Sequence, residues 1–226
     1  NAQLEPVVRG TDPQYWHVKD PVVQRSSQGD TTLFFCTHPY SWTSSNSAFM
    51  VRSANFRGMN SERAAKTDSA AAGVDSAEFG VPDFTFFPRG NTWDVAVSRI
   101  TDALYLAAKE TGLEDSLTMV FYDGAECMRD HDQNPAAVRR PRGYSCEEIA
   151  GLAVYWNDDP TTIQRVSRTH PLFLSPWGTG SCRYIHTAAT DEGIIATWQQ
   201  AQGDGSQPLV INAMTWDEVR ETMQDS

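Results

Sequence analysis

The 226-residue sequence is short of basic residues and of long apolar runs. It has 18 Lys and Arg against 29 Asp and Glu, and its net charge of -11 disfavours nucleic acid and anionic membranes as main partners, because like charges repel. No apolar run approaches the roughly 18 residues that span a bilayer, and no charged-then-apolar signal segment opens the chain. These absences predict no nucleic-acid or membrane partner and favour a neutral or locally recognised ligand.

Cysteine is also scarce, and Cys36, Cys127, Cys146 and Cys182 show no CxxC spacing, so a zinc site is not expected. In an oxidising compartment, Cys127 and Cys146 are the expected disulfide, because they bracket a polar loop that a bridge would stabilise by roughly 3 kcal/mol. Otherwise all four are expected to be buried thiols. The first residue, Asn1, is compatible with a processed export signal, which leaves a secreted or periplasmic location open.

Short apolar and β-branched runs make up most of the chain and are separated by Gly, Pro, Asn and Asp. They are DPVVQ, TTLFFCT, SAFMVRS, DFTFFP, VAVSRITDALYL, SLTMVFYD, AGLAVYW, TIQRVS, CRYIHTA, GIIATWQQ and PLVINAM. Helix is expected only in the Ala-rich stretch 61–73 and in the tail TWDEVRETM. We predict an all-β chain forming one domain over 1–226, with an exposed insertion at 57–80.

Closely spaced strands without helical crossovers leave a sandwich, a barrel or a propeller. Units of similar pattern begin near residues 18, 95, 148 and 182, and a weakly marked unit must lie between the first two. Five units of about 45 residues match the repeat length of four-stranded blades. The predicted fold is therefore a five-bladed β-propeller.

In a propeller the starts of the innermost strands meet at one mouth, and the loop after each second strand opens on the same face. Asp20 precedes the first of these strands, and Pro21 is tolerated there because a first strand position need not donate a ladder hydrogen bond. The same rule brings further polar residues to the mouth: His38, Trp42, Asn46, Asp94, Arg99, Asp123, Glu126, Glu147, Glu148, Arg183 and Asp204.

This set is rich in carboxylates that come from distant parts of the sequence. Cleavage of a glycosidic bond needs two carboxylates, one protonated to assist the leaving oxygen and one ionised to activate water or attack carbon. Aromatic rings stack on the apolar faces of sugars. Asp is also an ordinary turn residue, and this acidic chain has many, so the pattern alone leaves the function open.

The stretch HVKDPVV, followed by LFFCTHPYSWTSSNSAFMVR, resembles the first blade of five-bladed β-propeller glycoside hydrolases, the group of families forty-three, sixty-two, thirty-two and sixty-eight. Later stretches keep the order expected of bacterial members: TWDVAVSRITDAL, VFYDGAE, EEIAGLAV, LSPWGTGSCRYI and ATWQQAQGDGSQPLV. The resemblance runs from about residue 16 to 211 and omits 56–80.

The resemblance implies hydrolysis of a glycosidic bond by three acids, with inversion expected and retention less common. Asp20 matches the first-blade aspartate that acts as general base. Glu148 best matches the general acid, and Glu147 is the alternative. For the third acid, which orients the proton donor, Asp94 is the first choice, with Asp102 and Asp123 as alternatives.

The residues expected to bind substrate are His38, Trp42, Asn46, Arg99, Asp123 and Arg183. Each candidate also has a structural alternative. Asp20 is equally suited to cap a strand and pair with Lys19, and Arg99 and Arg183 are suited to ion pairs between blades as well as to a substrate carboxylate. No cofactor or metal is required, although related propellers hold an axial calcium, near which His186 would lie.

The predicted function is a glycosidase acting on a plant, algal or bacterial saccharide. The alternatives are a non-catalytic carbohydrate-binding propeller and a propeller that binds protein. Arg139, Arg140 and Arg142 stand together in an otherwise acidic chain, either to recognise a uronate or sulfated sugar or as exposed partners of nearby acids. The sugar, its linkage and the oligomeric state are not predictable from the sequence.

Overall fold

The computed structural model describes residues 8–10, 17–27, 31–38, 47–53, 74–76, 87, 89–125, 148–178 and 180–224. Several sequence predictions fall outside these ranges: Trp42, Asn46, Glu126, Glu147, the helix at 61–73, the Cys127–Cys146 disulfide and the three clustered arginines at 139, 140 and 142. Most of the insertion at 57–80 also lies outside, apart from β5, Val74–Ser76, which pairs antiparallel with β1, Val8–Gly10.

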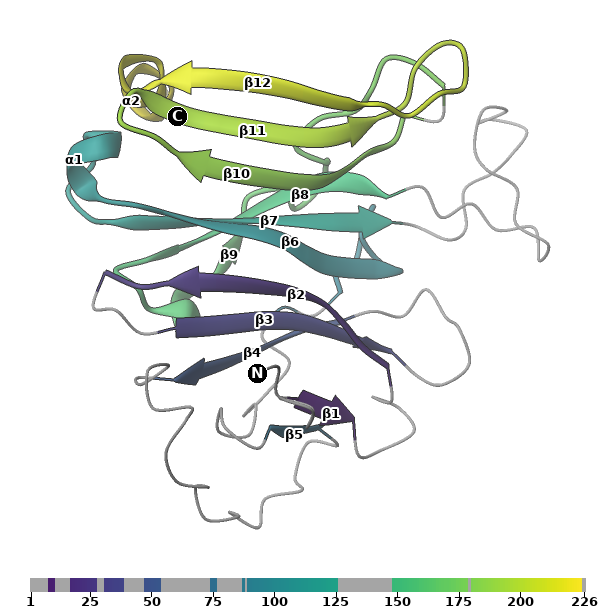
Figure 1. Ribbon diagram of the computed structural model, residues 1–226, viewed down its shortest axis with the longest axis horizontal. Helices are drawn as coiled ribbons and strands as arrows, with labels where there is room; N and C mark the ends of the chain where they lie inside the picture. The colour runs from purple at the N-terminus through teal and green to yellow at the C-terminus, as the bar shows by residue number, and fades with distance from the viewer. Residues whose placement is uncertain are drawn as a thin grey trace, which may run out of the picture.

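Ten of the described strands form three antiparallel units (Figure 1). The first unit holds β2 His17–Arg25, β3 Thr31–His38 and β4 Ser47–Ser53. The second holds β6 Val97–Leu106, β7 Leu117–Ala125 and β8 Ile149–Trp156, with the short β9 Gln164–Arg165 beside β8. The third holds β10 Cys182–Ala189, β11 Gly193–Gln200 and β12 Leu209–Thr215. The mainly β character expected from the sequence is confirmed.

The units are held together by two apolar cores on opposite faces of the second unit. Side chains alternate between the faces of a strand, so β7 sends Val120 and Tyr122 to one side and Phe121 to the other. Val120 and Tyr122 pack with Phe34 of the first unit. Phe121 packs toward Ile185 of the third unit. The three units therefore pack against one another, and they lie one above the other in Figure 1.

The first strands of the three units lie side by side, β2 beside β6 and β6 beside β10. A single parallel pair, Cys182 with Ile149, joins β10 to β8, so β10 runs in the direction of β6. In Figure 1 the arrows of β2 and β10 also point the same way. The prediction that a unit begins near residue 148 is wrong, because β8 pairs antiparallel with β7 along its length and completes the second unit.

Helices are short in the described part of the chain. They are α1, Ala108–Thr111, the 3-10 turn η3, Pro160–Thr162, and α2, Trp216–Gln224. The helix predicted in the tail is thus confirmed. It begins with a reciprocal cap, because Glu218 accepts from the Thr215 amide at 2.7 Å while the Thr215 hydroxyl accepts from the Glu218 amide at 3.3 Å. Within the described ranges, no helix has the length and apolar character needed to cross a membrane.

Candidate functional site

A bulge interrupts the first strand of every unit near its start. The pairing shifts between Lys19 and Val22 in β2, between Ile100 and Asp102 in β6, and between Arg183 and His186 in β10. Bulges re-aim side chains and are common next to binding sites. Two of the bulged residues, Asp20 and Tyr184, have φ of 53° and 58°, a region that costs a non-glycine residue roughly 1–2 kcal/mol.

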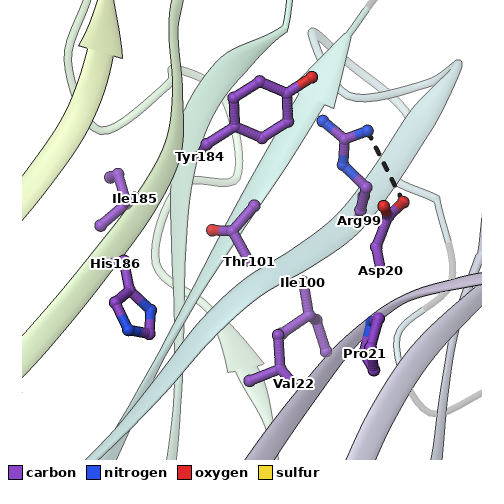
Figure 2. Close-up of a pocket in the computed structure, with 9 residues that line it drawn as sticks. All are labelled: Asp20, Pro21, Val22, Arg99, Ile100, Thr101, Tyr184, Ile185 and His186. Atoms are coloured by element: carbon purple, nitrogen blue, oxygen red, sulfur yellow. Dashed lines mark ion pairs between the residues drawn. The ribbon is translucent and has the colours of Figure 1, made fainter. Parts of the chain in front are cut away.

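The three bulges surround one cavity of about 250 Å³. Its lining comes from all three first strands and consists of Asp20, Pro21, Val22, Arg99, Ile100, Thr101, Tyr184, Ile185 and His186. Figure 2 shows the carboxyl of Asp20 and the guanidinium of Arg99 at one end, the Tyr184 ring beside them and His186 at the far end. The cavity is somewhat smaller than the roughly 300–1,000 Å³ of sites for drug-sized ligands, which suits one small unit.

Three carboxylates meet at Arg99, whose side chain is only 7% exposed. Its Nη2 lies 2.6 Å from Asp123 Oδ2 and 2.7 Å from Glu148 Oε1, and its Nη1 lies 3.7 Å from Asp20 Oδ2. Asp20 also pairs with Lys19 at 3.5 Å, as its structural alternative predicts. One cation therefore links acids from the first and second units.

A second arginine holds the far side of Glu148. Arg183 Nη1 lies 3.3 Å from Glu148 Oε2, and the rest of the guanidinium donates to Gln199 Oε1 at 2.7 Å and Gln207 Oε1 at 3.0 Å. The Tyr184 ring lies beneath both guanidinium groups, 4.8 Å from Arg99 Cζ and 5.1 Å from Arg183 Cζ. Such cation–π contacts add to the hold on the two arginines.

The strand order explains why these residues meet. In the antiparallel second unit, β6 and β8 begin at the end where β7 stops, so Glu148, directly before β8, lies at the end that holds Arg99 and Asp123. Arg99 and Asp123 are paired across β6 and β7 and so share a face. The amide of Tyr184 donates to Asp123 Oδ1 at 3.0 Å and brings in the third unit.

Burial controls the charge state of the central pair. Removal from water raises the pKa of Asp123 to about 7, and the nearby Glu148 adds to this, while Arg99 opposes it. Burial lowers the pKa of Arg99, but Glu148 and Asp123 outweigh it, so the net shift is upward and the guanidinium stays charged. The pKa of Tyr184 is raised by burial and then by Glu148. The charged Arg99 thus lies beside Asp123, whose pKa is raised.

Two of the acids considered for the third role lie elsewhere. Asp94 is fully buried, and its Oδ2 lies 2.7 Å from Arg165 Nε and accepts from the Tyr122 hydroxyl at 3.1 Å. Tyr122 and Asp123 are neighbours in β7 and point to opposite faces, so Asp94 lies away from Arg99. Asp102 accepts from the Thr187 amide and hydroxyl and lies 3.5 Å from His186 Nδ1.

Some of the predicted site residues meet in the structure and others do not. Asp20, Arg99, Asp123, Glu148 and Arg183 are brought together, whereas the side chain of His38, at the end of β3, lies outside the described set. Asp204 is exposed and accepts within its own turn from Ser206. Its pKa is lowered by these hydrogen bonds.

Residues that sequence reasoning missed include Tyr184, Gln199 and Gln207. Tyr184 directly follows Arg183, and an apolar–charged–aromatic order at a strand start offers no reason to expect a bulge. Among the described residues, no group of three or more His, Cys, Asp or Glu side chains is arranged to hold a metal ion. The axial calcium stays a prediction.

Comparison with known proteins supports the fold. No family model matches the sequence, and no curated protein matches it. A solved structure described as a glycoside hydrolase is similar at a TM-score of 0.50 and 11% identity, over 91% of this chain and 55% of that one. A solved structure described as a complex of BT0996 and RGII is similar at a TM-score of 0.50 and 11% identity, over 92% and 56%.

An alpha-L-arabinofuranosidase from Lactobacillus brevis is similar at a TM-score of 0.44 and 12% identity, over 86% of this chain and 48% of that one. The chain thus spans about half the length of the structures it matches. At these identities the likeness is one of fold. The protein has a mainly β fold similar to that of glycoside hydrolase structures.

Proposed function

We propose that the protein is a glycoside hydrolase in which Asp20 is the general base and Glu148 the general acid. One observation carries the proposal: Asp20 and Glu148, from different units, contact the same guanidinium beside a cavity. Their distances to Arg99 of 3.7 and 2.7 Å keep the two contacting oxygens within about 9 Å of each other, given the size of a guanidinium. That span is within reach of one sugar unit and its attacking water.

The proposed chemistry needs carboxylates and water alone. Lys19 and Arg99 pair with Asp20, which takes a proton from water attacking the anomeric carbon with inversion. Glu148 then gives a proton to the leaving oxygen. Asp123 fits the third role better than Asp94, because Asp123 and Glu148 share Nη2 of Arg99 and Asp123 therefore fixes the group that positions Glu148.

For the fold, we propose that the three units are blades of a five-bladed propeller. The support is that their first strands lie side by side in one direction and jointly line a cavity, as innermost strands do around a channel. The outer face of the third unit also carries Leu209 and Ile211, which are 79% and 70% exposed. A further blade would cover such a face.

The proposed substrate is a saccharide, and one of the similar structures is an RGII complex. The size of the cavity suits a single sugar unit, with Tyr184, 46% exposed, as the aromatic surface for its apolar face. Arg183 pairs with Glu148 at 3.3 Å and is next to Tyr184 in the chain. A terminal residue of a plant, algal or bacterial glycan fits this geometry.

The test is a panel of nitrophenyl glycosides and natural oligosaccharides, followed by variants on the best substrate. Asp20→Asn and Glu148→Gln should each lower kcat by about 100- to 10,000-fold, the usual contribution of general acid–base groups, while saccharide affinity stays near that of the wild type. Asp94→Asn is the matched control, since Asp94 lies outside the cluster, and should keep kcat. Undiminished turnover in either catalytic variant refutes the assignment.

A non-catalytic carbohydrate-binding protein is the second candidate. One observation favours it: Arg99 pairs with one oxygen of Glu148 and Arg183 pairs with the other. A carboxylate with both oxygens in ion pairs is poorly placed to donate a proton to a leaving group. The arginines then act as ion pairs between units. Saccharide binding seen by calorimetry with no turnover on any glycoside in the panel would select this candidate.

A further inference from the structure

Among the described residues, each hydrogen bond or ion pair of the Asp20 carboxylate falls on one oxygen. Oδ2 accepts from Cys36 Sγ at 3.2 Å, and it lies 3.5 Å from Lys19 Nζ and 3.7 Å from Arg99 Nη1. Figure 2 shows one oxygen of Asp20 joined to Arg99, with the Asp20 side chain among the residues that line the cavity. The three donors thus hold Oδ2 and leave Oδ1 as the oxygen available to the cavity.

Cys36 is the most constrained of these donors. It is 1% exposed and is the cross-strand partner of Lys19 in β3, where the bulge that displaces Asp20 begins. Burial raises the pKa of the Cys36 thiol far above its usual range, and the adjacent Asp20 raises it further, so the sulfur keeps its proton and acts as a donor. Lys19 is 36% exposed on a flexible side chain, and Arg99 is shared among three carboxylates.

The backbone at Asp20 is fixed by the bulge and by Pro21, with φ at 53°. What remains free is rotation of the carboxyl group, which a buried donor on one oxygen restricts. We infer that Cys36 is a positioning residue, whose thiol holds Asp20 Oδ2 so that Oδ1 faces the cavity. The hydrogen bond stands independently of the reaction, and its catalytic consequence rests on the proposed role of Asp20 as the base.

The hydrogen bond is tested first, without any activity, through the S–H stretch in the infrared, a region where other protein groups do not absorb. The band lost in Cys36→Val identifies the Cys36 thiol. In the wild type it should lie at lower frequency than the band of Cys182, and Asp20→Asn should move it to higher frequency. A Cys36 band that Asp20→Asn leaves in place overturns the inference.

The consequence is tested by kinetics on the best saccharide substrate. Cys36→Val keeps the volume but removes the donor, and kcat should fall about tenfold, the effect of roughly 1.4 kcal/mol, with KM unchanged. Cys36→Ser restores a donor and should recover most of kcat. Cys182→Val is the matched control, because Cys182 is the other free buried cysteine of the described residues and packs in the core between the second and third units.

The outcomes separate the two proposals. Equal kcat in Cys36→Val and the wild type, or equal losses in Cys36→Val and Cys36→Ser, would show that the thiol does not position the base. If Asp20→Asn keeps full turnover, the proposed function fails, and the infrared shift still decides whether Cys36 holds the carboxylate. Circular dichroism of every variant confirms that the fold is kept.

Discussion

Two buried arginine–aspartate clusters lie on opposite faces of the β6–β7 hairpin. In one, Arg99 meets Asp20, Asp123 and Glu148. In the other, Arg165 pairs with Asp94, donates to Ser98 Oγ at 3.0 Å and stacks 4.0 Å above the Phe87 ring. Both clusters bury a charged pair, so burial and pairing by themselves do not mark a functional site.

The two differ in charge balance and in access. The Arg99 cluster has several acids for its cation, draws them from two units and borders the cavity. The Arg165 cluster is closed by close packing: a Cβ on Gly90 would overlap the Asp94 carboxyl, and a Cβ on Gly124 would lie 2.7 Å from Asp94 Cβ. An excess of carboxylates at an open cavity is costly to maintain for stability alone, which favours a chemical role for the Arg99 cluster.

The largest loss of stability is expected from replacing the arginine at the centre of each cluster. Arg99→Met should destabilise the protein by about 3–5 kcal/mol, because it leaves the fully buried Asp123 without its partner and places it beside Glu148. Arg165→Met should cost less, because the structure pairs Arg165 with Asp94, whereas it pairs Arg99 with three acids. Urea unfolding at pH 7 measures both. The double variant Arg99→Met/Asp123→Asn should recover part of the loss, and an absence of recovery would contradict the account of Asp123.

A pH series gives the next largest effect. The pKa of Asp123 rises from 3.8 in the unfolded chain to about 7 on burial, so the folded state binds more protons between these values. Its contribution to stability is therefore present below about pH 4 and is lost as the pH rises to about 7, by up to a few kcal/mol. The urea midpoint at pH 4.5 and 7.5 should differ less in Asp123→Asn than in the wild type. Equal pH dependence in the two would count against a raised pKa.

Part of the fold and of the Arg99 cluster could be predicted from the sequence. The strands, the tail helix and the meeting of Asp20, Arg99 and Glu148 follow from alternation and from which strand ends share an edge. The convergence holds even though Glu148 precedes the third strand of a unit and not the first, because both strands begin at one end. Sequence reasoning preferred Asp94 to Asp123 as the third acid, because the face of the hairpin that each residue takes cannot be read from the sequence.

The bulges were equally hidden from sequence reasoning. A register shift in β10 turns Tyr184 toward the two arginines, and no turn residue marks it. The shift in β2 does coincide with Pro21, and the one in β6 has no such mark. The direction that a side chain takes after a bulge depends on packing between units. The alternation of apolar and polar residues within one strand carries no information about that packing.

The smallest of the expected effects tests the closed packing of the Arg165 cluster. In Gly124→Ala the added methyl would overlap the Trp93 ring and lie 2.7 Å from Asp94 Cβ, so the variant should lose about 1–3 kcal/mol through overpacking. Gly203→Ala is the control, because its nearest atom, on Trp177, is 3.4 Å away. Thermal unfolding should give a clearly lower Tm for Gly124→Ala than for Gly203→Ala. Equal Tm values would mean that the packing around Asp94 can adjust to an added methyl group. The Arg165 and Arg99 clusters would then differ only in the number of acids that each arginine contacts.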